Sequence, residues 1–349
     1  MRVGFDTTPL QRACPPGVAR AARETLQALE QRGRLEVVRL DPPARGSLSS
    51  WRRSLARVEQ EQGLVGIHSF LSAFPCFPLR GTGARVQTLH ELPWKHGVAE
   101  NADLAHRLWA RLGPLRADAT VVPTEHVARD VGRKLASSGG KLHVIGWGVS
   151  EHFAPEPPPG VIDEVLLERY RLPEGPFLLC LGAVRQKKNL AALLHGLAHL
   201  AATGRSVPHV VISGRDTPDL RRDLGLVSRL GLARHVSTPG ELEEQDLPGL
   251  LRLAAAVPVL SRSEGFGLPA LEATACGTPV IAPRGSAQAE VAGAEAFLCH
   301  PEDPAAVAEA VASAVEQREE LRWVLPDAAE GRSWQSTAEA LESLWAGLA

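Results

Sequence analysis

Residues 261–280 have the sequence Ser261-Arg-Ser-Glu-Gly-Phe-Gly-Leu-Pro-Ala-Leu-Glu-Ala-Thr-Ala-Cys-Gly-Thr-Pro-Val280, which combines two carboxylates, a glycine turn and the start of a helix. Short apolar runs at 254–260 and 279–282 are typical of strands, so the region predicts strand, turn, helix and strand. Pro269 suits the first position of a helix, where its missing N–H costs nothing. Gly277 favours the left-handed residue that ends a helix, so the predicted helix is short.

The start of this helix predicts a binding site for an anion, most simply a phosphate. Gly265 and Gly267 permit a tight turn, which directs unpaired N–H groups and the positive end of the helix dipole toward one point. Glu264 precedes the turn and Glu272 lies about one helical turn beyond Pro269, so both carboxylates can line the same crevice. Because they would repel a phosphate, we expect each to accept hydrogen bonds from sugar hydroxyls, one set from a ribose and one from a transferred sugar.

The composition predicts a globular chain of two domains. The chain has 349 residues, of which 44% are hydrophobic and 22% charged. Its formal net charge of -2 argues against a general nucleic-acid binder, which needs a basic surplus. The N-terminus lacks an apolar signal segment, and no run approaches the ~18 apolar residues of a membrane span, so we expect a cytoplasmic location.

The cysteines predict a reducing compartment without a disulfide framework or a zinc cluster, because their number is odd and they form no close pairs. They are Cys14, Cys76, Cys180, Cys276 and Cys299. Cys180 lies in an apolar strand pattern and Cys276 in the short helix, so both are expected to be small buried residues and not reactive thiols.

The first half of the chain alternates between predicted strands and helices. The strands are predicted at 2–6, 35–40, 64–70, 84–90, 119–123 and 141–145, and the helices at 18–30, 51–62 and 101–115, with another beginning at the capping residue Thr124. Gly17 lies at the entrance of the first helix. It either faces a ligand across a crevice or belongs to an ordinary strand-to-helix connection, and this feature alone favours the connection.

Two further features of this half have alternative interpretations. His90 ends a predicted strand of an open α/β sheet, where ligands usually bind, so it is suited to contact a sugar hydroxyl or an acceptor; a structural histidine is an equally good interpretation. Arg52, Arg53 and Arg57 lie on the amphipathic helix at 51–62, where they suit an anionic membrane surface or an acidic acceptor, although a solvated helix face is commoner.

A proline-rich stretch at 146–160 predicts the main domain boundary, because its three consecutive prolines form a stiff spacer. The alternation then resumes, with strands predicted at 177–182, 209–214, 235–240, 256–260 and 280–282 and helices at 189–202, 220–230, 246–255, 303–316 and 337–348. Arg185, Lys187 and Lys188 lie on the loop before the helix that Asn189 is expected to cap. Cations at a helix start oppose the helix dipole, which weakly favours an anion-binding loop over a solvated charge run.

His195 and His199 are one helical turn apart, but the sequence shows no third ligand beside them, so we predict no metal site there.

The order of these motifs resembles the family 4 glycosyltransferases, which have the GT-B fold. The most specific part is Glu264-Gly-Phe-Gly-Leu-Pro-Ala-Leu-Glu272, which matches the family's pattern of two glutamates separated by seven residues, followed by the family-like Ala273-Thr-Ala-Cys-Gly-Thr-Pro-Val280. The supporting motifs are Gly182-Ala-Val-Arg-Gln-Lys-Lys-Asn189, Thr88-Leu-His-Glu91, Gly17-Val-Ala-Arg20, Gly146-Trp-Gly-Val149 and Ser333-Trp-Gln-Ser-Thr-Ala338. The resemblance covers nearly the whole chain.

The resemblance implies an α/β GT-B fold with two Rossmann-like parallel-sheet domains facing a central cleft. It places an acceptor domain at 1–152, a nucleotide-sugar donor domain at 153–331, and a helix that crosses back to the first domain at 332–349. The implied activity is retaining transfer of a hexose, of mannose or glucose type, from a nucleotide-diphosphate sugar to a hydroxyl acceptor. The acceptor would be a growing glycan or a lipid-linked saccharide, which adds the inner face of the cell membrane as a location.

The resemblance also implies roles for individual residues. Glu272 would hold the ribose, and Glu264 and His90 would contact the donor sugar. Arg185 and Lys188 would neutralise the diphosphate, so no metal and no cofactor would be required. The implied catalytic set is Glu264, His90, Arg185 and Lys188, and the implied donor-binding set is Glu272, Lys187, Gly182, Gly265, Phe266, Gly267, Leu268 and Gly17.

Three positions depart from the family's pattern. Lys187 stands where the family often has an arginine, so Arg185 and Lys187 compete for one role at the diphosphate. Trp147 stands where asparagine is common, and Glu91 replaces a frequent aspartate. Trp147 is therefore expected to alter the hinge or the donor pocket.

Three other classes of protein fit parts of the pattern. A nucleotide-sugar epimerase has a related fold, and a family member without activity would bind a glycan or a protein partner. A dinucleotide oxidoreductase is remote, because no Gly-x-Gly-x-x-Gly follows the first strand.

Overall fold

The computed structural model describes residues 1–12, 14–43, 45, 47–71, 81–99, 104–135 and 141–348. They form two compact units. The first comprises Met1–Gly148 together with Gly331–Ala349, and the second comprises Val149–Glu330. The boundary expected between residues 152 and 153 lies close to this division. In the described part of the chain, no helix is long and apolar enough to cross a membrane.

A six-stranded, wholly parallel sheet forms the centre of the first unit. Its strands are β1 (Arg2–Asp6), β2 (Glu36–Leu40), β3 (Gly66–Ser69), β4 (Ala84–Thr88), β5 (Ala119–Val122) and β6 (Leu142–Val144). They lie in the order β2-β1-β3-β4-β5-β6, so the connections change direction between β1 and β3. The carboxyl ends of these two strands therefore flank a topological switch point, where open α/β sheets bind ligands.

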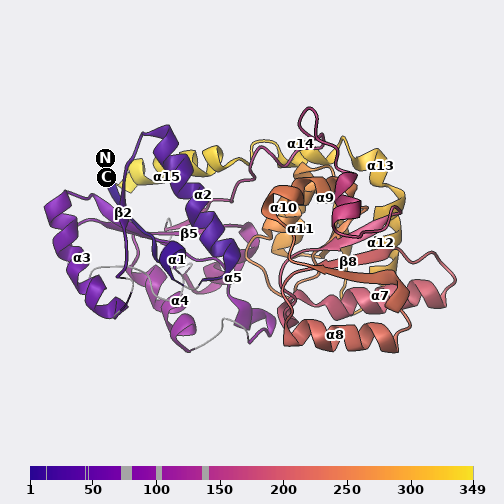
Figure 1. Cartoon of the computed structure of the whole chain (residues 1–349). Coiled ribbons are helices and arrows are strands. Elements are labelled where there is room, and N and C mark those ends of the chain that lie inside the picture. Colours follow the sequence, from indigo (N-terminus) through magenta and orange to yellow (C-terminus); the bar gives the residue numbers. More distant parts are fainter. Residues whose placement is uncertain are drawn as a thin grey trace. The chain divides into compact units, whose positions relative to one another are not determined.

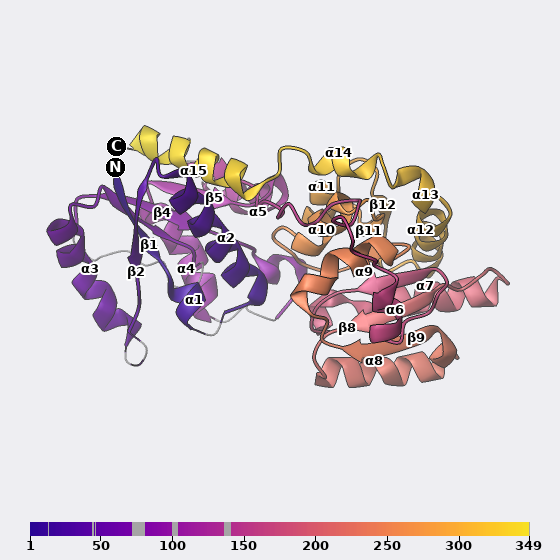
Figure 2. The ribbon, with the colours of Figure 1, turned by 45° about the horizontal axis from the view of Figure 1, so that its top comes forward.

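Helices surround this sheet. They are α1 (Thr8–Gln11), α2 (Pro16–Arg32), α3 (Leu48–Gln62), α4 (Leu104–Arg116), α5 (Glu125–Leu135) and α15 (Trp334–Leu348), with the 3-10 helix η1 (Pro93–His96) after β4. Helix α15, drawn in yellow in Figure 2, lies alongside α2. Arg32 of α2 donates to Glu342 of α15 at 3.0 Å. Trp345 is fully buried, and a Cβ at Gly66 would lie 2.8 Å from its ring, so glycine permits this approach.

The second unit has a parallel sheet in two sections. Its strands are β7 (Phe177–Cys180), β8 (His209–Ser213), β9 (Val236–Gly240), β10 (Val257–Pro258), β11 (Val280–Pro283) and β12 (Phe297–Cys299). The first three pair in the order β7-β8-β9 and the last three in the order β10-β11-β12. A parallel bridge between Leu178 and Ala256 joins the sections, which gives the order β9-β8-β7-β10-β11-β12. The switch point of this sheet thus lies between β7 and β10.

Helices cover both faces of the second sheet (Figure 1), with α7 and α8 on one side and α10 and α11 on the other. The helices are α6 (Val165–Arg169), α7 (Leu190–Ala202), α8 (Pro218–Arg229), α9 (Leu247–Leu253), α10 (Leu268–Ala275), α11 (Ala287–Ala292), α12 (Pro304–Glu316), α13 (Arg318–Leu321) and α14 (Leu325–Ala329), with the 3-10 helices η3 (Gln186–Lys188), η4 (Ala233–His235) and η5 (Glu244–Asp246). Leucines of α7 and valines of α12 pack together in the core of this unit.

Two predicted elements differ from those observed. The strand predicted at 256–260 is reduced to Val257–Pro258. Pro258 has no N–H to donate, so pairing with β7 does not extend beyond the bridge at Ala256. The helix predicted at 18–30 begins at Pro16, a residue suited to the first helical position, so Gly17 lies inside the first turn and not before it.

The described cysteines are free thiols. Cys276 is buried as predicted, whereas Cys180 is only partly buried. Burial raises the pKa of both thiols to about 12, which keeps them protonated and unreactive at neutral pH. Cys76 lies outside the described residues.

Candidate functional site

A pocket lies at the switch point of the second unit. Residues from the ends of β7 and β10 line it, including Gly182 and Leu260, together with Lys188 of η3 and Pro269 of α10. The sequence alone predicted that the glycine turn, the short helix and the basic loop carry the site. The structure brings the basic loop, through Lys188, and the short helix, through Pro269, to one pocket, whereas Gly265 and Gly267 of the glycine turn are not among its lining residues.

Lys188 and Glu264 form an ion pair at this pocket. The Lys188 Nζ donates to the Glu264 Oε1 at 2.7 Å, and both side chains are largely shielded from solvent. Burial raises the pKa of the Glu264 carboxyl, but the charges of Lys188 and Lys187 and the accompanying hydrogen bonds lower it by more. The carboxylate is therefore ionised at neutral pH. The two residues expected to contact different parts of a ligand thus contact each other.

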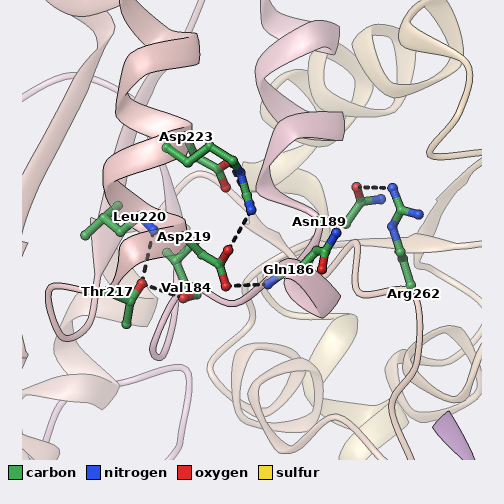
Figure 3. Close-up of polar contacts among 9 residues, drawn as sticks. Val184, Gln186, Asn189, Thr217, Asp219, Leu220, Asp223 and Arg262 are labelled. Carbon is green, nitrogen blue, oxygen red and sulfur yellow. Dashed lines mark hydrogen bonds and ion pairs between the residues drawn. The ribbon is translucent and has the colours of Figure 1, made fainter. Parts of the chain in front are cut away.

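The loop after β7, residues 183–189, is fixed by the start of α8 (Figure 3). Thr217 caps α8 by accepting from the Leu220 N–H at 3.0 Å, and its hydroxyl donates to the Val184 carbonyl at 2.7 Å. Asp219 accepts from the Gln186 N–H at 3.0 Å. These contacts position the lysines of η3. Neither Thr217 nor Asp219 was predicted from the sequence, although Thr217-Pro218-Asp219 is a typical helix start that could have indicated them.

Asn189 does not act as the side-chain cap that the sequence predicted. It occupies the N-cap position of α7, but its φ of 56° is left-handed and its side chain makes no capping bond. The side chain instead faces Arg262, whose guanidinium donates to the Asn189 Oδ1 at 3.5 Å (Figure 3). The Arg262 N–H also donates to the Lys187 carbonyl at 2.8 Å. Arg262 thus adds a cation to this loop that the sequence analysis did not select.

Helix α10 follows the glycine turn as predicted, but it begins at Leu268, one residue before the position predicted for Pro269. Gly267 is the N-cap residue with a φ of 88°, and a Cβ there would lie 3.1 Å from the Gln288 side chain. Gln288 donates to the Ser261 carbonyl at 3.1 Å, which holds the chain before the turn. Phe266 and Glu272 are buried, and Gly277 ends the helix region with a φ of 71°. These contacts hold the start of the helix in place, and they thereby fix the position of the unpaired backbone N–H groups of its first turn, from Leu268 onward.

Two glycines allow the loops after β7 and β8 to approach each other. Gly182 has a φ of 85° and Gly214 a φ of 143°, and a Cβ on Gly214 would lie 2.7 Å from the Gly182 carbonyl oxygen. Any larger residue at 214 would displace the loop that carries Lys188. Gly182 was predicted from the sequence, whereas Gly214 was not, although its place as the last residue of the strand predicted at 209–214 was a usable signal.

The first unit has a separate polar cluster at its own switch point. Asp6, the last residue of β1, is fully buried and accepts from the Thr8 N–H at 2.9 Å and from the Ser69 hydroxyl at 3.0 Å. Burial raises the pKa of its carboxyl, against the effect of these hydrogen bonds and of the Arg52 charge. Asp6 was not predicted from the sequence, although its place at the end of a predicted strand was a usable signal.

His90 is also placed in the first unit, two residues beyond β4. Its Nε2 is 2.8 Å from the Phe70 carbonyl oxygen, and its ring centroid is 5.7 Å from that of Trp147. Burial lowers the pKa of His90 to about 4, so the imidazole is neutral at pH 7. With Nε2 protonated to bond the carbonyl, the other ring nitrogen is an acceptor. Gly17 lies in the same unit, at the first turn of α2, with open space where a Cβ would be.

The fold is shared with solved glycosyltransferases. A sucrose-phosphate synthase from Thermosynechococcus elongatus has a TM-score of 0.80 to this structure, at 20% sequence identity, over 99% of this chain and 98% of that one. HepE from Anabaena, solved in complex with UDP-glucose, has a TM-score of 0.75 at 18% identity, over 99% of this chain and 100% of that one. These likenesses confirm the expected GT-B fold.

The sequence matches a known family in its second unit. Residues 166–330 match the family described as glycosyl transferases group 1, which confirms the resemblance for this part of the chain. D-inositol 3-phosphate glycosyltransferase of Xylanimonas cellulosilytica is 35% identical over 169 residues, which are 48% of this chain and 40% of that protein. The mannosyltransferase WbdA of Escherichia coli is 31% identical over 196 residues, 54% of this chain and 23% of that protein. The chain thus spans less than half the length of either relative.

Proposed function

We propose that this protein is a retaining glycosyltransferase that moves a hexose from a nucleotide-diphosphate sugar to a hydroxyl acceptor. The observation that carries the proposal is the ion pair of Lys188 and Glu264 at the pocket between β7 and β10. An ammonium and a carboxylate held together suit a donor that carries both a diphosphate and sugar hydroxyls. The match of residues 166–330 to the group 1 glycosyl transferases supports this assignment.

The diphosphate would be bound by the loop after β7 and by the start of α10. Lys188 would contact it directly, and Arg185 and Lys187 would add charge from the same loop. The first-turn N–H groups at Leu268 and beyond would donate to a phosphate oxygen, since an N-terminal turn has four unpaired donors. These cations would neutralise the leaving diphosphate, so we propose that the transfer proceeds without a metal ion.

The two glutamates would bind hydroxyl groups. Glu272 is 3% exposed on α10, and its carboxylate is suited to the vicinal hydroxyls of a ribose. The Glu264 carboxylate would accept hydrogen bonds from hydroxyls of the transferred sugar, while its Oε1 stays paired with the Lys188 ammonium. Two similar proteins support a hexose donor in general terms, because HepE was solved with UDP-glucose and WbdA is a mannosyltransferase.

The proposed transfer conserves atoms and charge within donor and acceptor. The bond between the anomeric carbon and the diphosphate oxygen breaks, and the acceptor oxygen forms a new bond to that carbon on the same face. The acceptor proton passes to the departing phosphate, which Lys188 stabilises. Electrostatic stabilisation of that developing charge is the main contribution of the protein. Glu264 positions the donor and is not assigned as a nucleophile.

Product analysis separates this function from its two alternatives. The purified protein is incubated with UDP-, GDP- and ADP-linked glucose and mannose, with and without a mixed glycan and glycolipid acceptor fraction, and the products are followed by mass spectrometry and NMR. We expect acceptor-dependent release of a nucleoside diphosphate and a product with the anomeric configuration of the donor. An epimerised nucleotide sugar formed without acceptor would identify an epimerase. No turnover and no donor binding would identify a binding protein.

The first unit has an exposed apolar stripe that suits a membrane-borne acceptor. Leu104, Leu108 and Leu115 of α4 are 84%, 52% and 60% exposed. At helical spacing they share one face with the partly exposed Leu112, and the exposed Arg107, Arg111 and Arg116 flank them. Apolar residues between cations are typical of helices that lie on anionic bilayers. We propose that α4, more than the arginines of α3, makes the peripheral membrane contact.

Replacing Leu104 and Leu108 together with Ser is expected to weaken binding to anionic vesicles at least tenfold, because each leucine withdrawn from lipid loses about 1.5 kcal/mol. Co-sedimentation with phosphatidylglycerol vesicles measures this loss. The matched control is Ile162→Ser, since Ile162 is 61% exposed in the second unit. Equal sedimentation of all three proteins would show that α4 does not bind the bilayer.

A further inference from the structure

Two histidines and an aspartate lie together in the first unit, outside the residues assigned above. His96 is the last residue of η1, and His126 and Asp130 lie four residues apart on one face of α5. One ligand atom from each side chain lies within 4.8 Å of the other two. The His96 Nε2 is 2.7 Å from the Asp130 Oδ2, and the rings of His96 and His126 stack with centroids 5.2 Å apart.

The three side chains are accessible and chemically suited to bind a cation. His96 and Asp130 are 27% and 20% exposed, so an ion can enter from solvent. The Lys95 Nζ donates to the backbone carbonyl of Asp130 and lies 3.9 Å from the Oδ1, whereas His96 contacts the Oδ2.

We propose that His96, His126 and Asp130 form a binding site for a divalent first-row transition metal of the zinc type. Two imidazoles and a carboxylate are ligands that such ions prefer. Zinc bonds of about 2.0–2.2 Å place the ligand atoms of a tetrahedral site roughly 3.4 Å apart. The three ligand atoms are already within 4.8 Å, so side-chain rotations of modest size complete the site. A fourth position stays open to water.

A metal ion at this site would link η1 to α5. Elements η1 and α5 follow the neighbouring strands β4 and β5, and η1 lies at the end of the segment that begins at His90. A metal bound by His96 and by α5 ties that segment to the helix and limits its movement. This role does not depend on the proposed transfer reaction. From the sequence we predicted no metal site at His195 and His199, and among the described residues only the cluster around Asp130 gathers three ligands.

Calorimetric titration with Zn²⁺ tests the site in full-length protein that has no histidine tag and has been freed of metal with a chelator. We expect one saturable equivalent in the wild type and a rise in melting temperature. His126→Ala and Asp130→Asn should each weaken binding by about 10-fold or more, since even outer-sphere partners of a metal contribute 10- to 100-fold. Co²⁺ should give visible absorption bands in the wild type alone.

His199→Ala is the matched control, because it removes a histidine from the other helical pair and should leave Zn²⁺ binding unchanged. Circular dichroism establishes that each variant is folded before titration. Absence of a saturable equivalent in the wild type would overturn the proposal. So would undiminished binding in both His126→Ala and Asp130→Asn, or loss of binding in His199→Ala.

Discussion

Replacing Lys188 with Ala is expected to lower kcat/KM for sugar transfer by about 10²- to 10³-fold, the effect of losing one charged or hydrogen-bonding group aimed at a developing negative charge. Its ammonium is fixed at 2.7 Å from Glu264 and borders the pocket at the end of β7. Removal also leaves the ionised carboxylate of Glu264 without its partner. Initial rates of nucleoside diphosphate release, measured over a range of donor concentrations, give the change.

Two further variants make this result specific. Arg221 forms an exposed ion pair with Asp216 on the same unit, so Arg221→Ala controls for the loss of one positive charge and should keep full activity. In the double variant Lys188→Ala with Glu264→Gln, the unpaired carboxylate is gone, so stability should recover while transfer stays low. A change of less than threefold in Lys188→Ala would contradict the role assigned to the ammonium.

Replacing Arg252 with Ala is expected to destabilise the second unit by about 3–5 kcal/mol, because the buried carboxylate of Asp163 then loses its charged partner. The Arg252 guanidinium binds both oxygens of Asp163, at 2.6 Å and 2.9 Å, and donates to the Ala154 carbonyl at 3.0 Å. The two side chains are only 3% and 8% exposed. The ion pair thus fastens the chain at 154–163 to α9. Urea unfolding followed by fluorescence and circular dichroism measures the free energy of unfolding.

The control for Arg252 removes both charges. Arg252→Met with Asp163→Leu leaves no buried carboxylate and should recover most of the lost stability, because buried ion pairs are often replaceable by apolar residues of similar volume. Arg169→Ala is the single-charge comparison and should cost much less, because the Arg169 side chain is half exposed and its buried partner Asp246 keeps a hydrogen bond from the Tyr170 hydroxyl at 2.7 Å. If Arg169→Ala and Arg252→Ala lowered the free energy of unfolding equally, burial of the ion pair would not determine its contribution to stability.

Much of the fold follows from local sequence patterns. Apolar runs predicted every observed strand at about its place except the three-residue β12, which was missed, and the short helix from Leu268 to Ala275 begins and ends where glycine and proline impose their backbone preferences. The exceptions also have local causes. Strand β10 is short because Pro258 has no N–H to donate. Asn189 has a left-handed backbone conformation, and its side chain contacts Arg262 instead of capping α7.

The candidate site was harder to predict because it depends on residues far apart in the sequence. The sequence indicated cations at 185–188 and a carboxylate at Glu264, but it could not show that Lys188 and Glu264 pair directly. Gly214 matters only because the Gly182 carbonyl lies against it, and His96 and Asp130 come together only through the pairing of β4 with β5. Such proximities arise from sheet order, which local patterns do not specify.

The central claim is that the pocket of the second unit binds a nucleotide-diphosphate sugar through Lys188 and Glu272. The most direct test is calorimetric titration of the wild type, Lys188→Ala and Glu272→Ala with UDP, GDP, ADP and their glucose or mannose conjugates. We predict that one nucleotide series binds the wild type at one site per chain, stabilising it by about 2.7 kcal/mol at 100 times the Kd, and that both variants bind at least tenfold more weakly. Failure of every nucleotide to bind, or equal binding by all three proteins, would contradict the account.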